Sequence, residues 1–285
     1  MIKIATLGPK NTFSELAAIE YQQKIRNNKN TFNSRDSQIC LFPSIKKVFK
    51  AVNTDFDLGI VPIENMLDGY VQSVLDLLLH SNLQIINELV LPIQFAFVAN
   101  CHELSSVEKI YAQFVTQGQC SDFIEQFNNV SIVTTDSNGT SYRLVKNGTK
   151  KDGAIISIHS LQNGNFPLNL KNIEDFHNNQ TRFIVIGKQN AEYLPDKIYK
   201  TSIVVINGED RPGVLYNILQ VFADEKINMV SIMSRPTKEI LGKYHFFIDI
   251  EGHLNDPCVK KSLEIITESK YNIKILGSYP EVEKW

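Results

Sequence analysis

Four polar segments of this 285-residue chain carry residue types that could bind or act on a small anion. They are residues 8–14, 61–69, 134–140 and 179–183. Each lies where an apolar run, predicted to be a strand, begins or ends. Because ligands of open α/β sheets bind just outside the carboxyl ends of strands, these segments are the candidate site.

The first three segments offer hydroxyl, carboxamide and carboxylate groups. Thr12 and Ser14 follow a Gly-Pro turn and begin a predicted helix, whose unpaired N–H groups attract anions. Glu64 and Asn65 end a short apolar strand, and Ser137 lies in a hydroxyl-rich turn before another helix. An ordinary turn that caps the next helix explains these three segments equally well.

The fourth segment reads Asn-Gln-Thr-Arg-Phe and leads into the apolar strand 183–187. A buried arginine is costly unless an anion meets its charge, so Arg182 indicates a bound carboxylate. Its guanidinium suits that role because it binds carboxylates through two parallel hydrogen bonds. Thr181 beside it offers a hydroxyl. The alternative is a surface arginine at a strand edge.

The elements that must position these residues alternate between strand and helix, which predicts an α/β body. Short strands are expected at residues 2–7, 58–62, 89–100, 130–135, 153–158 and 183–187. A polar stretch follows, and beyond it the order β-α-β-β-α-β in about 80 residues is typical of a ferredoxin-like module, with Asp256 capping the last helix. We expect the body at 1–187, a linker at 188–200 and the module at 201–285.

Composition narrows the class of protein. Lys plus Arg number 29 and Asp plus Glu 31, which argues against a nucleic-acid or anionic-membrane partner. The four cysteines lie far apart, so neither a disulfide framework nor a zinc site is expected. The chain shows no signal-peptide or membrane-spanning pattern, which favours a cytoplasmic protein. No nucleotide loop or metal constellation occurs, so we expect no cofactor and no metal.

Taken in order, the motifs resemble those of the prephenate dehydratase family over essentially the whole chain. The family's Gly-Pro-x-Gly-Thr-Phe-Ser stands at 8–14, its Val-Pro-Ile-Glu-Asn-Ser-x-x-Gly-x-Val at 61–71, its Leu-Asp-Leu-Leu at 75–78 and its Asn-x-Thr-Arg-Phe, intact, at 179–183. The C-terminal module resembles the regulatory ACT domain of these enzymes. Gly-Val-Leu-Tyr at 213–216 and Met-Ser-Arg-Pro at 233–236 carry that similarity.

The resemblance implies a two-lobed body, like a periplasmic binding protein, with the active site between its lobes and no metal or organic cofactor. It implies the conversion of prephenate into phenylpyruvate during phenylalanine synthesis, with loss of water and CO2. It also implies feedback inhibition by L-phenylalanine at ACT-domain interfaces, and therefore a homodimer or homotetramer.

Prephenate carries two carboxylates and a ring hydroxyl that leaves as the ring becomes aromatic. The enzyme must hold the dianion and protonate the leaving group. We expect Arg182 to clamp a carboxylate and Thr181 to deliver a proton or hydrogen bond to the hydroxyl. Glu64 is an alternative acid if burial raises its pKa. Residues expected to orient the substrate are Thr12, Ser14, Asn65, Ser137, Asn179 and Phe183.

The residues expected to bind phenylalanine are Gly213, Val214, Leu215, Asn228, Ser234 and Arg235. One departure from the family falls in this group. Met233 replaces a glutamate, and its thioether is a weak acceptor for an amino-acid ammonium. This replacement weakens the case for control by phenylalanine more than the case for catalysis.

Other departures lie in the body. Asn11 replaces a glycine, and asparagine tolerates positive φ best among the other residues. Met66 replaces a serine, and Val74 stands where many members have threonine. The family's Ser-His-Pro-Gln-Ala-Leu stretch reads Ala-Gln-Phe-Val-Thr-Gln at 112–117, with only Gln119-Cys120 recognisable after it.

Two other functions stay open. A prephenate decarboxylase that retains the ring hydroxyl would suit Met66 and Val74, but the retained Thr181 argues against it. A non-catalytic amino-acid sensor on the same scaffold is the second, because ACT modules are mostly sensors and a shared fold does not fix function.

Overall fold

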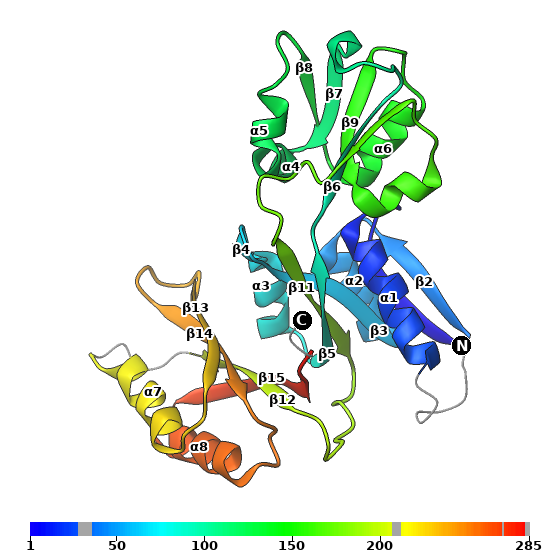
Figure 1. The fold of residues 1–285 in the computed structure, drawn as a ribbon. Coiled ribbons are helices and arrows are strands. Elements are labelled where there is room, and N and C mark those ends of the chain that lie inside the picture. The colour runs from blue at the N-terminus through cyan, green and yellow to red at the C-terminus, as the bar shows by residue number, and fades with distance from the viewer. Residues whose placement is uncertain (28–35, 207–211, 270, 283–285) are drawn as a thin grey trace. The chain divides into compact units, whose positions relative to one another are not determined.

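A computed structural model describes residues 1–27, 36–206, 212–269 and 271–282, which form three sheets (Figure 1). The first has the strand order β2-β1-β3-β11-β5, with β4 paired to β3. Its elements are β1 (Ile2–Leu7), α1 (Phe13–Asn27), β2 (Ser37–Phe42), α2 (Ile45–Thr54), β3 (Leu58–Asn65), β4 (Gly69–Tyr70), α3 (Gln72–His80), β5 (Gln84–Pro92) and β11 (Gln180–Gly187).

The inner strands of this sheet are short apolar runs, as strands covered on both faces must be. Ile4 and Ala5 of β1 and Ile60 and Val61 of β3 are fully buried. β1 coincides with the predicted strand 2–7, and the polar pair Glu64-Asn65 ends β3. The buried apolar residues of β3 therefore determine the position of Glu64 and Asn65 at the end of the strand.

The second sheet has the order β10-β6-β9-β7-β8. Its elements are β6 (Phe95–Ala99), β7 (Lys109–Gln113), α4 (Phe114–Gln119), α5 (Ser121–Ile124), β8 (Ser131–Thr135), α6 (Asn138–Lys146), β9 (Asp152–Ser157) and β10 (Leu168–Lys171), with 3-10 turns at Leu104–Ser106 and Ile158–Asn163. Side chains of β6 alternate between two cores. Phe97 packs with Phe123 of α5, whereas Val98 packs with Tyr142 and Val145 of α6.

The chain crosses between these two sheets twice, between β5 and β6 and between β10 and β11, which gives the expected two-lobed body. Residues 89–100 were expected to be one strand, and this was wrong: β5 ends at Pro92 and β6 begins at Phe95. The strand breaks because Ile93 N donates to Asn179 O of the returning segment, at 2.8 Å, instead of continuing the ladder. This bond ties the two crossings together.

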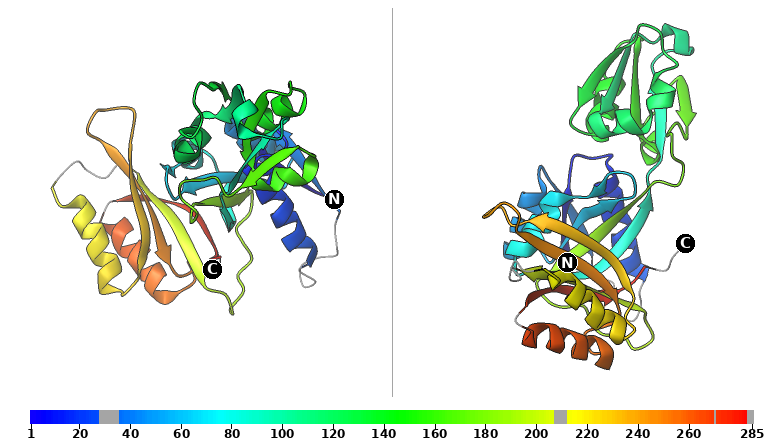
Figure 2. Two further views of the ribbon diagram at one scale, coloured as in Figure 1. Left: turned by 45° about the horizontal axis from the view of Figure 1, so that its top comes forward. Right: turned by 90° about the vertical axis from the view of Figure 1, so that its left-hand side faces the viewer.

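The C-terminal module is a four-stranded antiparallel sheet, β13-β14-β12-β15. Its helices lie side by side on one face of the sheet (Figure 2). Its elements are β12 (Tyr199–Ile206), α7 (Val214–Asp224), β13 (Met229–Pro236), β14 (Tyr244–Glu251), α8 (Pro257–Glu268) and β15 (Asn272–Pro280). This confirms the predicted β-α-β-β-α-β order. Asp256 precedes α8 as predicted, but its carboxylate accepts from His253 N rather than from the helix.

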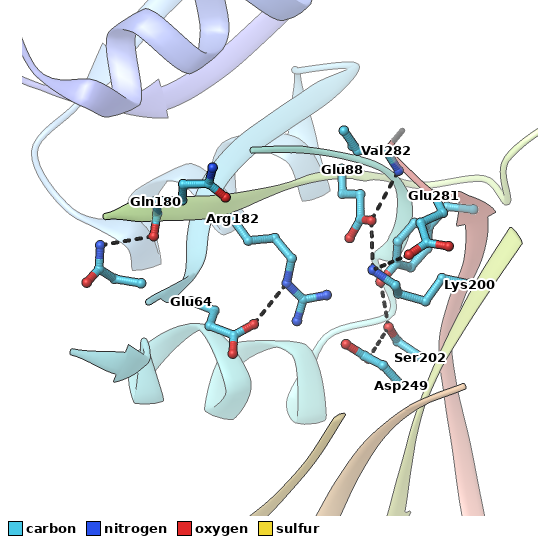
Figure 3. Close-up of polar contacts among 11 residues, drawn as sticks. Glu64, Glu88, Gln180, Arg182, Lys200, Ser202, Asp249, Glu281 and Val282 are labelled. Atoms are coloured by element: carbon cyan, nitrogen blue, oxygen red, sulfur yellow. Dashed lines mark hydrogen bonds and ion pairs between the residues drawn. The ribbon is translucent and has the colours of Figure 1, made fainter. Parts of the chain in front are cut away.

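By contacts the chain forms two compact units. One comprises Met1–Val48, Ile60–Tyr70 and Val90–Phe183, and the other Phe49–Gly59, Val71–Leu89 and Ile184–Trp285. In the second unit, Lys200 at the start of β12 lies 2.8 Å from Glu88 of β5, and both side chains are buried (Figure 3). Lys200 thus belongs to a strand rather than to the polar linker expected at 188–200. No helix among the described residues is long and apolar enough to cross a membrane.

Candidate active site

The end of β3 lies beside the start of β11. Met66 N donates to Gln180 O at 2.9 Å, so two motifs more than a hundred residues apart in sequence meet at one point. Glu64 and Asn65 come from one strand, and Thr181 and Arg182 from the other. Both strands are fixed by buried side chains, Phe183 among them, which is 1% exposed and belongs to the core.

Asn65 joins the two motifs through its side chain. Its Nδ2 donates to Asn179 Oδ1 and to Thr181 Oγ1, both at 2.9 Å, and to Gln180 O at 3.2 Å. Its Oδ1 accepts from Leu67 N and from the next backbone N–H, each at 3.0 Å, which fixes the orientation of the amide. The Thr181 hydroxyl is therefore the acceptor in this bond, and its own proton remains to be donated.

Two residues that the sequence did not single out complete this network. Gln119, at the end of α4, accepts from Asn179 Nδ2 at 3.2 Å. Its Nε2 donates to Asp68 Oδ2 at 2.7 Å. The available signals were weak: Gln119 belongs to the recognisable pair after the drifted stretch, and Asp68 lies in the polar segment 61–69.

A cavity of about 540 Å³ lies against this network. Asp68 and Gln119 line it together with Leu67, Phe114, Val115, Gln117, Gly118 and Phe176. Phe114 is 74% and Phe176 59% exposed, so apolar rings are available to a ligand there. Apolar walls with a few convergent polar groups are typical of a small-molecule site. These lining residues include no lysine or arginine, so a carboxylate bound here needs donors from other segments.

Arg182 faces Glu64 (Figure 3). Its Nε lies 3.2 Å from Glu64 Oε2, its side chain is 12% exposed, and its guanidinium lies 6.0 Å from the centre of the Tyr70 ring. Because neighbouring residues of a strand point to opposite faces, Arg182 and Thr181 face different sides of β11. The anion that meets Arg182 in this structure is thus Glu64. Glu64 therefore lies on the side of β11 away from Thr181.

The loop at residues 8–14 is fixed by hydrogen bonds within itself and to α1, and by a hydrogen bond from Ser157. Thr12 is the N-cap of α1, because its hydroxyl accepts from Glu15 N at 3.4 Å and donates to Pro9 O at 3.0 Å. Ser14 is buried in the first turn. Asn11 has φ of 66°, as expected for a residue replacing glycine, and its carbonyl accepts from Ser157 Oγ at 3.1 Å.

Ser137 caps α6 by accepting from Thr140 N at 3.1 Å. Gly139, in the first turn of α6, lies so close to Lys10 O that a Cβ there would overlap it. The loop at 8–14 and the start of α6 are therefore neighbours. Helix α4 connects the start of α6 with the network around Asn65. Its Thr116 donates to Asn138 Oδ1 of α6 at 2.9 Å, and its Gln119, one turn later on the same face, binds Asn179.

Comparison with known proteins gives the same assignment as the motifs. The family model for prephenate dehydratase matches residues 4–191, and that for the ACT domain matches residues 202–268. The chain belongs to the prephenate dehydratase family.

Relatives and solved structures agree over almost the whole length. The prephenate dehydratase of Methanocaldococcus jannaschii is 34% identical over 274 residues, covering 95% of this chain and 96% of that protein. A bifunctional chorismate mutase/prephenate dehydratase of Aquifex aeolicus is 33% identical over 282 residues, covering 98% and 74%. The crystal structure of a prephenate dehydratase from Arthrobacter aurescens, in complex with L-Phe, superposes with a TM-score of 0.83 at 28% identity, covering 98% and 90%.

Two departures from the prephenate dehydratase pattern lie in different surroundings. Met66 is 66% exposed and belongs to the turn that carries Leu67 and Asp68 at the cavity. Val74 is fully buried within α3. Only Met66 therefore lies next to the candidate site.

The regulatory residues expected in the ACT domain have varied partners. Gly213 has φ of +90° and precedes α7, whose first turn contains Val214 and Leu215. Asn228 Nδ2 donates to Glu251 Oε1 at 2.9 Å. Ser234 is exposed on β13.

Arg235 of β13 binds side chains of α3. Its Nε and Nη2 donate to the two carboxylate oxygens of Asp76, at 3.0 and 2.9 Å, and Nη1 donates to Gln72 at 2.7 Å. The hydrogen bond from Arg235 lowers the pKa of Asp76 to about 2, with a further contribution from Lys238. At the other end of α3, Lys274 of β15 donates to the Leu78 and Leu79 carbonyls at 2.9 and 2.8 Å. Two ACT strands thus hold both ends of this helix.

Proposed function

We propose that this chain converts prephenate into phenylpyruvate, water and CO2. The observation that carries the proposal is the hydrogen bond from Asn65 to Thr181, where Thr181 belongs to the intact Asn-x-Thr-Arg-Phe motif. The same hydrogen-bond network contains Asp68 and Gln119, which line a cavity of about 540 Å³. Membership of the prephenate dehydratase family supports the assignment.

The reaction breaks two bonds of prephenate. The bond between ring and carboxylate carbon breaks to release CO2, and its electron pair enters the ring as the bond to the hydroxyl oxygen breaks. One proton joins the leaving hydroxyl to give water, so the dianion takes up one proton overall. A threonine hydroxyl is a weak acid, so we assign Thr181 a hydrogen bond to the leaving oxygen, with the proton supplied through it or from solvent.

The substrate carboxylates need donors that the cavity lining lacks. The starts of α1 and α6 lie side by side through the contact of Gly139 with Lys10, and helix N-termini stabilise anions. We assign carboxylate binding to this region, with Thr12, Ser14 and Ser137 lining it. Arg182 then acts by fixing Glu64, and with it the end of β3, while Asn179 and Phe183 hold β11. This chemistry uses no cofactor.

Regulation by L-phenylalanine is part of the proposal. A structure of a related enzyme is described as a complex with L-Phe, and the ACT domain is present in this chain. The start of α7, with Gly213 exposed and Val214 and Leu215 half-buried, is the region we assign to the effector, together with Asn228 and Ser234. Arg235 is already bound to α3, so we assign it to transmission of the signal.

We also propose a homodimer, with a homotetramer as the alternative, in the cytoplasm. β13 lies at the end of its sheet and carries Val230 and Ile232, which are 40% and 42% exposed. An edge strand with exposed apolar side chains is a surface on which a second copy could pack. Of the expected division we keep the catalytic body at 1–187, and we place the start of the ACT domain at Tyr199, where β12 begins, so that the connecting segment is 188–198.

An assay of the purified full chain with prephenate tests the function. We expect phenylpyruvate, detected by its absorbance in alkali, and inhibition when L-phenylalanine is added. A sensor would bind the amino acid in a calorimeter and turn over nothing. A decarboxylase would release CO2 and leave a non-aromatic product.

A further inference from the structure

Asp68 contacts both ends of the network that holds Thr181. Its backbone N–H donates to Asn65 Oδ1 at 3.0 Å, and its Oδ2 accepts from Gln119 Nε2 at 2.7 Å. Asn65 and Gln119 are joined in turn through Asn179. The four residues therefore form a closed ring of hydrogen bonds, from which the bond to Thr181 branches.

Donation runs in one direction around this ring. Asn65 donates to Asn179, Asn179 to Gln119, and Gln119 to Asp68, whose backbone N–H donates back to Asn65. An amide side chain can be turned over to exchange donor and acceptor, but an ionised carboxylate only accepts. Asp68 therefore holds the Gln119 amide with its oxygen toward Asn179, while the backbone N–H groups of residues 67 and 68 hold the other end of the ring at Asn65.

Turning Gln119 over would be costly. Its amino group would then face the amino group of Asn179, and both are buried, at 7% and 2% exposure. A buried donor without an acceptor costs the full loss of its hydration. Movement of Asn179 would in turn remove one acceptor from Asn65 Nδ2, which also holds Thr181.

We propose that Asp68 is a positioning residue for the dehydration step: it holds Gln119 and, through Asn179, steadies the Asn65 amide that binds Thr181, so that the Thr181 hydroxyl stays turned to donate toward the leaving group. Asp68 acts through Gln119 and need not touch the substrate. This inference rests on the proposed function.

Kinetics of the full-length protein with prephenate test this role. Asp68 is exposed, so Asp68→Ala should fold, which a thermal melt checks. We expect Asp68→Ala to lower kcat about tenfold or more with KM changed less than about threefold, because the lost effect lies in the transition state. Asp68→Glu, which keeps an acceptor-only group, should recover most of kcat. Asp55→Ala, at an exposed aspartate after α2, is the matched control and should behave as wild type.

A double variant separates a positioning role from an independent one. If Asp68 acts through Gln119, Asp68→Ala combined with Gln119→Ala should be no slower than Gln119→Ala alone. If the two substitutions lower kcat independently, the double variant will be slower than Gln119→Ala by the factor that Asp68→Ala causes alone, and this would overturn the inference. An unchanged kcat in Asp68→Ala, or an effect on KM alone, would overturn it as well. A wild-type protein without dehydratase activity would instead refute the proposed function.

Discussion

Asn65 Nδ2 donates to Thr181 Oγ1 at 2.9 Å, between strands that are 116 residues apart in sequence. The same nitrogen also donates to Asn179 Oδ1 and Gln180 O, so three acceptors converge on one amino group. Thr181 accepts this bond, so its own hydroxyl proton is left to be donated elsewhere.

Replacing Asn65 with aspartate should abolish most of the turnover. Asn65→Asp puts a carboxylate oxygen opposite three acceptors, so the Thr181 hydroxyl would turn to donate to the new carboxylate instead of to the substrate. We expect kcat to fall by about a hundredfold or more, as on loss of a positioned donor, with a smaller change in KM. Steady-state kinetics measure both, and near-normal kcat would contradict the role of this bond.

Glu64→Gln tests which side of β11 is catalytic. Glu64 pairs with Arg182 on the face away from Thr181, so removal of its charge should leave kcat within about fivefold of wild type. The free energy of unfolding should fall by about 1–3 kcal/mol, because the largely buried Arg182 loses the charge of Glu64 beside it. Urea unfolding and the prephenate assay provide the two readouts. A loss of kcat by about a thousandfold would instead make Glu64 the general acid.

Asp76→Asn should weaken feedback inhibition without slowing the uninhibited enzyme. The bidentate pair with Arg235 joins the ACT sheet to α3, and α3 directly follows the segment that carries Asn65 and Asp68. We expect inhibition by a fixed L-phenylalanine concentration to fall about fivefold or more, while kcat without phenylalanine stays within about twofold. Asp224→Asn, at an exposed aspartate of α7, is the control. Unchanged inhibition in Asp76→Asn would exclude this route.

Gly139→Ala should destabilise the region assigned to carboxylate binding. A Cβ at Gly139 would overlap the backbone oxygen of Lys10, which cannot yield as a flexible side chain could. We expect the free energy of unfolding to fall by about 2 kcal/mol or more, with KM for prephenate raised as the loop shifts. Gly118→Ala is the control for stability, since nothing lies within 4 Å of its Cβ within α4. Equal stability of the two variants would contradict the close packing of these segments.

Much of the fold could be predicted because the signals are local. The run at residues 2–7 is apolar and ends at Gly-Pro, and β1 has those bounds. The positive φ of Asn11 was predictable because asparagine, which tolerates positive φ, stands where the family has glycine. The strand expected at 89–100 was wrong because Pro92 lies within it, and the structure breaks there.

The polar network could not be predicted in full. The bond between Asp68 and Gln119 depends on two segments that meet only in the folded chain, and Gln119 follows a stretch that has drifted from the family pattern. Strand alternation separates Thr181 from Arg182, but it does not say which of the two meets Asn65 and which meets Glu64. The partner of Arg235 is likewise a tertiary contact, on a helix more than 150 residues earlier.

The most direct test of the central claim is turnover of prephenate by wild type and by Thr181→Val, which keeps the shape of the side chain and removes only the hydroxyl. We expect wild type to form phenylpyruvate, Thr181→Val to lose about a thousandfold or more in kcat with prephenate binding nearly unchanged in a calorimeter, and Thr181→Ser to retain much of the rate. A Thr181→Val protein that turns over prephenate at close to the wild-type rate would contradict the assignment of Thr181 to the leaving group.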